Sequence, residues 1–389
     1  MQKLMFFDYR ELEVVRGFAR RLQQPTKWAG NPLFVADQPW ENGNMQLYGS
    51  VVKAPEKPFQ LWYSTVERPW CIRLAYAESK DGISWTRPQL DFFRHKGDQT
   101  NILMADDVHG TAVIHDMADP DPVCRYKLVS EMQSSACVKV MLSGDGMDWR
   151  ELAREPQIPF EPDCPMAFFR ACDGRYVALH RVRSWGRRIC RSESFDLKHW
   201  SRQPRMIFEP GPGDLAQTQF YGMGVTTYGP YEIGTLWVFH TDEDEMGRGH
   251  MNGYQEAELA YSRSGYAWHR ADQGTAFIPH GQPGCWDCGN LQCASQPVFL
   301  EDEIRYYYVG TDMRHQRQWE LVPQTAGLGM AHLEPDRFVA LEVGSTTGEL
   351  LTVAFAPAGH RLFMNADTGK DGWVKVALLD AEGKNLEGL

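Results

Sequence analysis

The chain has 389 residues, of which 43% are hydrophobic, so it can form the core of one large repeat domain or of two ordinary domains. Its formal net charge of −11 argues against nucleic-acid partners, because proteins that bind nucleic acid usually carry a basic stripe and only the stretch Arg181–Arg188 is basic here. The sequence lacks an apolar run of about 18 residues, so we also expect no membrane-spanning helix.

Residues 1–30 begin with MQKLMFFDYRE, which lacks the apolar h-region of a signal peptide. The sequence as given therefore predicts a cytoplasmic protein, whereas a chain from which a signal peptide had been removed would be secreted or periplasmic. The nine cysteines, an odd number spread through a large chain, favour reduced thiols over a disulfide framework. The runs FFDYRELEVV and GFARRLQQP predict edge strands that help to close a ring or cover a C-terminal module.

A short phrase that ends in tryptophan recurs four times along the chain. The copies are ESKDGISW, LSGDGMDW, ESFDLKHW and YSRSGYAW, which end at Trp85, Trp149, Trp200 and Trp268. Each copy has a serine six residues before its tryptophan, and most have Asp and Gly in between, where they favour a tight turn. We interpret each phrase as the hairpin between two outer strands, with the tryptophan packed between neighbouring units.

Each phrase follows two apolar runs that are rich in strand-forming residues. The runs come in the pairs MQLYGSVV and FQLWYSTV, GTAVIHD and RYKLVSEM, PMAFFRA and RYVALHRV, and FYGMGVTTY and GTLWVFHT. A fifth unit is indicated by LQCASQPVFL, IRYYYVGTD and LGMAHL, with Phe338 in the aromatic position. Units of about 60 residues lie within the range of β-propeller blades. The sequence thus predicts an all-β fold with a five-bladed β-propeller over residues 31–341.

The pattern changes after Leu341. Short strands are expected at ELLTVAFAP, HRLFMNA and GWVKVALLD, which are separated by turns that contain glycine. This alternation predicts a short β-sandwich-like module over residues 342–389.

A carboxylate precedes the innermost strand of every predicted blade. These residues are Glu41 in PWENGN, Asp107 beside Asp106 in MADDVHG, Asp163 in EPDCPM, Asp214 in GPGDLAQ and Asp287 in CWDCGN. In a propeller such positions converge on one mouth of the central channel, where crowded carboxylates shift one another's pKa values and create the acid and the base that glycosidic cleavage requires. Aspartate is also a common loop residue, and that explanation suits two or three of the five positions. The catalytic candidates are Asp163, Asp287, Glu41 and Asp107.

Sugar binding needs flat apolar faces and paired hydrogen bonds. Trp40 and Trp286 stand beside two of the candidate carboxylates and offer stacking faces, although a packing role suits them equally well. Further candidates lie at or near strand ends in equivalent parts of the blades, and they are His109, Arg181, Tyr221, His240 and His315. Arg181 is the best of these because a guanidinium binds two hydroxyls or a carboxylate at once.

The segment CWDCGNLQC raises the question of a metal site, since Cys285 and Cys288 form a C-x-x-C pair. A structural zinc site normally shows a second knuckle of similar spacing, which the sequence lacks. We expect neither a metal nor a cofactor. The sequence also lacks a glycine-rich phosphate loop and a G-x-S-x-G elbow, which argues against nucleotide-binding and α/β-hydrolase folds.

The series NPLF, PWE, LWYSTV, AYAESKDGISW, YKLVSEM, GRYVALHRVR and GLGMAHLEPDRFVAL resembles glycosidase-like proteins of planctomycetes and other polysaccharide-degrading bacteria. Their fold is similar to the five-bladed propeller of glycoside hydrolase families 32, 43, 62 and 68, with a C-terminal β-sandwich. The resemblance implies a base or nucleophile in blade one, a carboxylate that tunes the acid in blade two and a proton donor in blade three. By position these roles fall on Glu41, Asp107 and Asp163. Glu41 stands where those families have Asp and Asp163 where they have Glu, so the assignment of acid and base stays open.

Three functions are consistent with these observations. The first is a glycoside hydrolase that cleaves an oligo- or polysaccharide, with a furanoside as one candidate. The second is a glycoside phosphorylase, which would need a phosphate pocket built from Arg181, Arg183 and His240. The third is a propeller that binds carbohydrate without catalysis.

Overall fold

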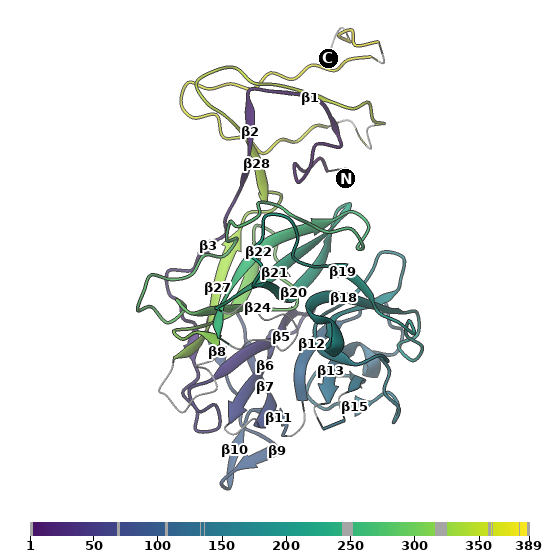
Figure 1. The fold of residues 1–389 in the computed structure, drawn as a ribbon, viewed down its shortest axis with the longest axis vertical. Coiled ribbons are helices and arrows are strands. Elements are labelled where there is room, and N and C mark those ends of the chain that lie inside the picture. Colours follow the sequence, from purple (N-terminus) through teal and green to yellow (C-terminus); the bar gives the residue numbers. More distant parts are fainter. Residues whose placement is uncertain are drawn as a thin grey trace. The chain divides into compact units, whose positions relative to one another are not determined.

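A computed structural model describes residues 3–67, 71–105, 108–132, 134–135, 137–242, 252–315, 325–356, 359, 361–380 and 382–386 (Figure 1). Nearly all of its regular structure is β-strand, with two short 3-10 helices, η1 (Pro122–Cys124) and η2 (Arg183–Trp185), within those ranges. None of the described helices has the length and apolar character needed to cross a membrane. The chain divides into a larger unit, Gln24–Glu334, and a smaller unit made of the residues on either side of it.

The larger unit consists of antiparallel sheets that follow one another along the chain (Figure 1). The first sheet contains β5 (Met45–Lys53), β6 (Phe59–Glu67), β7 (Cys71–Ser79), β8 (Trp85–Thr86) and β11 (Ile102–Met104). The second contains β12 (Val108–His115), β13 (Tyr126–Met132), β14 (Cys137–Ser143) and β15 (Arg150–Glu151). The third contains β16 (Pro162–Arg170), β17 (Tyr176–Val182), β18 (Gly186–Ser194) and β19 (Arg205–Phe208).

The fourth and fifth sheets are joined by a single parallel bridge between Gln255 and Asn290. The fourth contains β20 (Thr218–Tyr228), β21 (Tyr231–Thr241), β22 (Gly253–Ser262) and β23 (His269–Arg270). The fifth contains β24 (Asn290–Cys293), β25 (Val298–Phe299), β26 (Ile304–Thr311) and β27 (Ala326–Leu333), to which β3 (Thr26–Lys27) and β4 (Phe34–Val35) add an edge. A small hairpin, β9 (Leu90–His95) with β10 (Asp98–Thr100), projects from the first sheet region.

The first strands of the sheets contact one another in order: β5 with β12, β12 with β16, and β16 with β20. The fifth sheet completes the succession, because the Ser295 carbonyl accepts a hydrogen bond from the Val225 amide of β20 and the Ser295 amide donates to the Gly49 carbonyl of β5. A hollow of about 550 Å³ at the far ends of these strands is lined by residues from all five sheets. These contacts are those of a five-bladed β-propeller, as expected.

The strands next to the axis have apolar residues on both faces because neighbouring sheets cover both faces. In β5, every residue except Lys53 is buried. Separate apolar clusters fill the wedges between adjacent blades, for example the cluster of Leu47, Leu61, Tyr307 and Leu328 between the first and fifth sheets. The core of the larger unit is therefore divided among the wedges.

The tryptophan phrases form the expected hairpins. In the first copy, the Ser79 hydroxyl accepts from the amide of Gly82, and the Asp81 carboxylate accepts from the amides of Ile83 and Ser84. The same serine bonds recur in the other copies. Each tryptophan packs against the preceding blade, as Trp85 does edge-to-face on Tyr307. The prediction that these phrases are structural is confirmed.

Two pairs of strands lie in the described part of the smaller unit. β1 (Leu12–Arg16) pairs with β29 (Glu349–Thr352), and β2 (Phe18–Leu22) pairs with β28 (Val339–Val343). The strands expected at HRLFMNA and GWVKVALLD are not formed in the described residues 361–380, and this expectation was wrong. Their large apolar side chains, such as Phe363 and Trp373, are exposed, so those residues lack the buried face that strands of a sandwich require. The β-sandwich itself stays a prediction.

Candidate functional site

The innermost strands of the first four blades are irregular near their first residues. The pairing register shifts within β5, β12, β16 and β20, between Gln46 and Ser50, His109 and Thr111, Asp163 and Ala167, and Phe220 and Gly222. Such bulges bend a strand and redirect side chains. Tyr48, Cys164 and Tyr221 lie within these irregularities, and their side chains meet where the four strands come together.

The side chains that gather at this point are called the axial cluster. Its members come from four blades and from the segment after β26, and they are Tyr48, His109, Glu131, Asp163, Cys164, Arg181, Arg183, Arg187, Tyr221 and His315. All lie at the end of the propeller where the innermost strands begin, because the register places Asp163 opposite Arg181 and His109 opposite Glu131.

Asp163 and Arg181 form the principal ion pair of the cluster. Nε of Arg181 donates to Oδ2 of Asp163 at 2.9 Å, and its NH1 donates to the carbonyl oxygen of Tyr221 at 3.1 Å. The guanidinium also lies 4.6 Å from the centre of the Tyr221 ring. Arg181 is almost fully buried, whereas the Asp163 side chain keeps 22% of its surface exposed. Asp163 is therefore a firmly held carboxylate that solvent can reach.

Burial by itself raises the pKa of Asp163, but the charge of Arg181 and its hydrogen bond outweigh burial and leave the pKa below its ordinary value. Asp163 is ionised at neutral pH. Burial lowers the pKa of His109 to about 4, so this imidazole is neutral at the same pH. Burial, followed by the charge of Asp163, raises the pKa of the Cys164 thiol, which therefore stays protonated.

Glu131 contacts three other members of the cluster. Its Oε2 atom accepts a hydrogen bond from the Cys164 amide at 3.0 Å and lies 3.1 Å from Nδ1 of His109. Its Oε1 atom accepts from Arg183. The Cys164 sulfur lies 3.0 Å from Nδ1 of His109. Glu131 is almost fully buried, so its contacts serve to position His109 and the β16 backbone.

Aromatic rings form one wall of the cluster. The ring of Tyr221 stacks on Tyr48 and on Trp237, with centroid separations of 6.4 and 6.5 Å. Its hydroxyl oxygen lies 2.8 Å from Nε2 of His315. The guanidinium of Arg187 lies 4.7 Å from the centre of the same Tyr221 ring. A surface of this kind, with rings beside fixed polar groups, is typical of sites for small polar ligands.

The backbone around Cys164 is strained. Phe160, Glu161 and Cys164 all have positive φ angles, of 72°, 48° and 44°, which residues other than glycine seldom adopt. Gly110 on β12 lies directly opposite, and a Cβ atom at that position would stand 2.5 Å from Cα of Cys164. Strained backbone of this kind concentrates at functional sites. It supports the axial cluster as the candidate active site.

Four members of the cluster carry groups that can bind a metal. One donor atom each of His109, Glu131, Asp163 and Cys164 lies within 4.8 Å of the others. Both carboxylates are already paired with arginines, Glu131 with Arg183 and Asp163 with Arg181. Because these guanidinium charges oppose a second cation, the set fits a metal ion poorly.

The cluster brings together six of the residues named from the sequence: His109, Asp163, Arg181, Arg183, Tyr221 and His315. Tyr48, Glu131, Cys164 and Arg187 were not expected. The signal for Glu131 was available, since it is the next-to-last residue of the second strand of its blade, as Arg181 is in the next blade. Asp107 lies outside the described residues.

Glu41 and Trp40 lie apart from the described contacts of the axial cluster. Glu41 is fully buried, and it accepts hydrogen bonds from the Tyr63 hydroxyl at 2.6 Å and from Arg87 at 2.8 Å. Burial raises the pKa of Glu41, and the charge of Arg87 opposes that shift. The indole nitrogen of Trp40 donates to Asn101. These contacts anchor the segment before β5 to the first sheet.

Asp287 and Trp286 contact the fifth blade. Oδ2 of Asp287 accepts from Lys27 on β3 at 2.6 Å and from the Tyr308 hydroxyl at 3.1 Å. Trp286 stacks on the ring of Tyr308 at 5.7 Å. Asp287 thus links the edge strand β3 to the blade.

His240 and Asp214 also have partners of their own. Nε2 of His240 lies 2.7 Å from Glu256, and its ring stacks on Tyr254. Asp214 accepts a hydrogen bond from Arg270. Cys285 is exposed, and the Cys288 thiol faces the carbonyl of Asp312.

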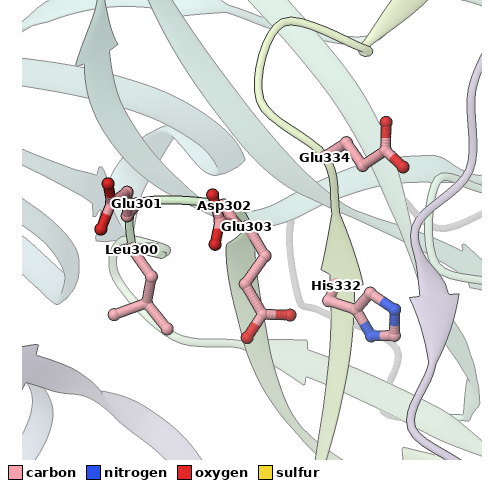
Figure 2. A pocket seen from close by; sticks show the side chains of 6 residues that line it. All are labelled: Leu300, Glu301, Asp302, Glu303, His332 and Glu334. Carbon is pink, nitrogen blue, oxygen red and sulfur yellow. The ribbon is translucent and has the colours of Figure 1, made fainter.

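A second hollow, of about 350 Å³, lies in the fifth blade, beside the turn before β26 and the end of β27. Figure 2 shows Leu300, Glu301 and Asp302 on the turn before β26, with His332 and Glu334 along β27 and after it. Glu303 in this hollow is paired with Arg305 at 2.6 Å. The carboxylates that line this hollow point in different directions in Figure 2. The hollow therefore lacks the convergent polar groups of the axial cluster.

No protein-family model matches the chain, and no curated protein sequence matches it either. Solved structures resemble it over most of its length. An inferred glycosidase from Bacteroides thetaiotaomicron is 14% identical, with a TM-score of 0.56 over 80% of this chain and 97% of that chain. The chain has the fold of glycosidase-like proteins.

Two other solved structures show the same likeness. An inferred glycoside hydrolase from Parabacteroides distasonis is 14% identical, with a TM-score of 0.52 over 82% of this chain and 97% of that chain. The β-1,2-mannobiose phosphorylase of Listeria innocua, in complex with β-1,2-mannobiose, is 13% identical, with a TM-score of 0.52 over 80% of this chain and 97% of that chain. At these identities the likeness concerns the fold, and the chemistry must be argued from the site.

Proposed function

We propose that the protein cleaves a glycosidic bond of an oligo- or polysaccharide at the axial cluster, with Asp163 as the carboxylate that acts on the substrate. The observation that carries this proposal is the position of Asp163. It is a solvent-accessible carboxylate at the meeting point of the innermost strands, and it is held by Arg181, whose guanidinium also packs on the Tyr221 ring. The shared fold with glycosidase-like proteins supports it.

The state of Asp163 suits a particular part of the reaction. Glycosidic cleavage passes through a transition state in which positive charge develops on the sugar ring, and an ionised carboxylate stabilises that charge, activates water or attacks the ring. Because Arg181 keeps the pKa of Asp163 low, its carboxylate is ready for these roles at neutral pH. The neutral imidazole of His109 stands beside it as a hydrogen-bonding group for a sugar hydroxyl.

The direct test is a screen of aryl glycosides and of plant and algal glycans with the wild-type protein and with Asp163→Asn. The variant keeps the size of the side chain and removes its charge. We expect a loss of about 100-fold or more in kcat, as for other catalytic carboxylates. Asp173→Asn, in an exposed turn of the same blade, is the matched control and should retain full activity. Undiminished turnover by Asp163→Asn would remove Asp163 from the mechanism.

The same screen separates the alternatives. Water and inorganic phosphate are both possible acceptors of the glycosyl group, and phosphorolysis is favoured by the placement of Arg181 and Arg183 in the cluster. Products that form only in phosphate buffer would identify a phosphorylase. A sugar that binds without any product would identify a carbohydrate-binding protein instead.

A further inference from the structure

Cys285 and Cys288, the C-x-x-C pair, lie in a tight turn just before β24. The backbone amide of Cys288 donates to the carbonyl of Cys285 at 3.3 Å. A turn closed by a bond of this kind brings its two end Cα atoms within about 7 Å of each other. Disulfide bonds join cysteines whose Cα atoms are about 4.4–6.8 Å apart. The backbone of this turn therefore suits a bond between the two cysteines.

The two thiols differ in exposure. Cys285 is exposed, whereas Cys288 is partly buried and its thiol donates to the carbonyl of Asp312, with sulfur and oxygen 3.8 Å apart. Access controls the rate of thiol–disulfide exchange, so an oxidant in solution meets Cys285 first. An exposed cysteine with a second cysteine beside it is the arrangement that redox-sensitive cysteines often have.

The two residues between the cysteines hold the turn in its closed shape. Trp286 stacks on the Tyr308 ring at 5.7 Å, and Asp287 accepts from Lys27 at 2.6 Å. Neither contact uses a sulfur atom, so both can persist when the thiols react. A metal role is disfavoured, because the described residues offer no group of three metal donors that includes this pair.

We propose that Cys285 and Cys288 form a reversible disulfide in exchange with a low-molecular-weight disulfide such as oxidised glutathione. The Cys285 thiolate attacks one sulfur of that disulfide, whose S–S bond breaks and releases one thiolate. The Cys288 thiolate then attacks the Cys285 sulfur and releases the second. The protein thus loses two electrons and two protons, and the small disulfide becomes two thiols. This modification site is separate from the proposed glycosidic cleavage.

The test is thiol labelling after the folded protein has been equilibrated with oxidised glutathione. The protein is then denatured in excess N-ethylmaleimide, and the tryptic peptide 271–305 is analysed by mass spectrometry. This peptide contains three cysteines, Cys285, Cys288 and the buried Cys293. We expect a label on each of them before oxidation and a label on Cys293 alone afterwards. Treatment with dithiothreitol should restore the other two labels.

Two variants check the order of the steps. Cys288→Ser lacks the second thiol, so glutathione should remain on Cys285 as a mixed disulfide. Cys172→Ser removes another exposed cysteine and is the matched control, in which peptide 271–305 should behave as in the wild type.

The wild-type measurement decides the proposal even where a variant fails to fold. A label that persists on Cys285 or Cys288 after oxidation would overturn it. Glutathione that stays on Cys285 in the wild-type protein would do the same, because Cys288 would then not have reached the mixed disulfide.

Discussion

Arg181 is the residue on which the geometry of the site depends most. It holds the Asp163 carboxylate, the Tyr221 carbonyl and one face of the Tyr221 ring at the same time. A lysine would supply the charge without the planar fork that makes these contacts together. The side chain therefore joins the third blade to the fourth at the axis.

Replacement of this residue by an apolar one should be costly. In Arg181→Met, the Asp163 carboxylate loses its partner, and we expect the free energy of unfolding to fall by about 3 kcal/mol. Arg188→Met, which breaks a pair with the half-exposed Glu209, should change it by less than about 1 kcal/mol. Urea denaturation at pH 7 measures both values. Equal losses in the two variants would show that the Arg181–Asp163 pair stabilises the fold no more than the surface pair of Arg188 and Glu209.

The same pair predicts a dependence on pH. The folded-state pKa of Asp163 lies below the ordinary value of 3.8, so the stabilisation by the pair is fully present above about pH 4 and is lost as the pH falls through the folded-state pKa. The stability difference between the wild type and Arg181→Met should therefore shrink below pH 4. A constant difference down to pH 2 would contradict the assignment.

His180, the residue before Arg181, is fully buried and predicts a second loss of stability at low pH. Nδ1 of His180 donates to the Arg181 carbonyl at 2.7 Å, and burial lowers its pKa to about 4. Between pH 6.5 and 4 the His180 imidazole becomes protonated in the unfolded chain but stays neutral in the folded chain. The free energy of unfolding therefore falls by about 3 kcal/mol as the pH decreases through this range. His180→Gln should make the stability curve flatter in this range, as measured by urea denaturation at successive pH values. An unchanged slope would contradict the burial of a neutral imidazole.

At the scale of elements, the irregular starts of the innermost strands create the site. Regular pairing would alternate side chains strictly between the two blade faces, whereas the register shifts in β5, β16 and β20 turn Tyr48, Cys164 and Tyr221 toward one another. The close approach of β12 to β16 at Gly110 also shapes the site, because it brings the two strands together beside Cys164.

This approach gives an element-scale prediction. Gly110→Ala places a methyl group against the Cys164 backbone and should lower the free energy of unfolding by about 3 kcal/mol or more, with a loss of activity. Gly229→Ala, at a similar φ of 57° but with open space around it, isolates the conformational cost and should lower stability by only about 1 kcal/mol. Thermal denaturation of both variants checks the difference. Equal effects would mean that strand approach at Gly110 is not critical.

At the scale of the whole larger unit, two strands from early in the chain complete the last blade of the ring. β3 and β4 pair antiparallel with β27, and the Lys27–Asp287 ion pair fastens β3 to the blade. Lys27→Met and Asp287→Asn should each lower the melting temperature. The double variant should be little worse than either one, with a coupling energy of about 1 kcal/mol or more. Additive effects would indicate that the two side chains act independently.

The architecture could be predicted from the sequence because the patterns that indicate it are formed by residues close together in the chain. The hairpin bonds of Ser79 and Asp81 join residues two or three positions apart, so their repeat shows directly in the sequence. The site was only partly predictable. The direction of a side chain just before a strand depends on bulges, and Asp163 turns toward Arg181 whereas Asp287 turns toward Lys27. The place of Glu131 in its strand could have been matched to that of Arg181, but its contact with His109 depends on the register of β12 with β13.

The pairing of β3 and β4 with β27 joins segments about 300 residues apart, as the Asn31 side chain bonded to the Met330 carbonyl illustrates. During translation the early partner leaves the ribosome long before the late one exists. Until β27 is made, the nascent chain holds four blades with exposed edges, and such intermediates are prone to aggregate. Closing so large a loop is slow, and we expect it to be the final and rate-limiting stage of refolding.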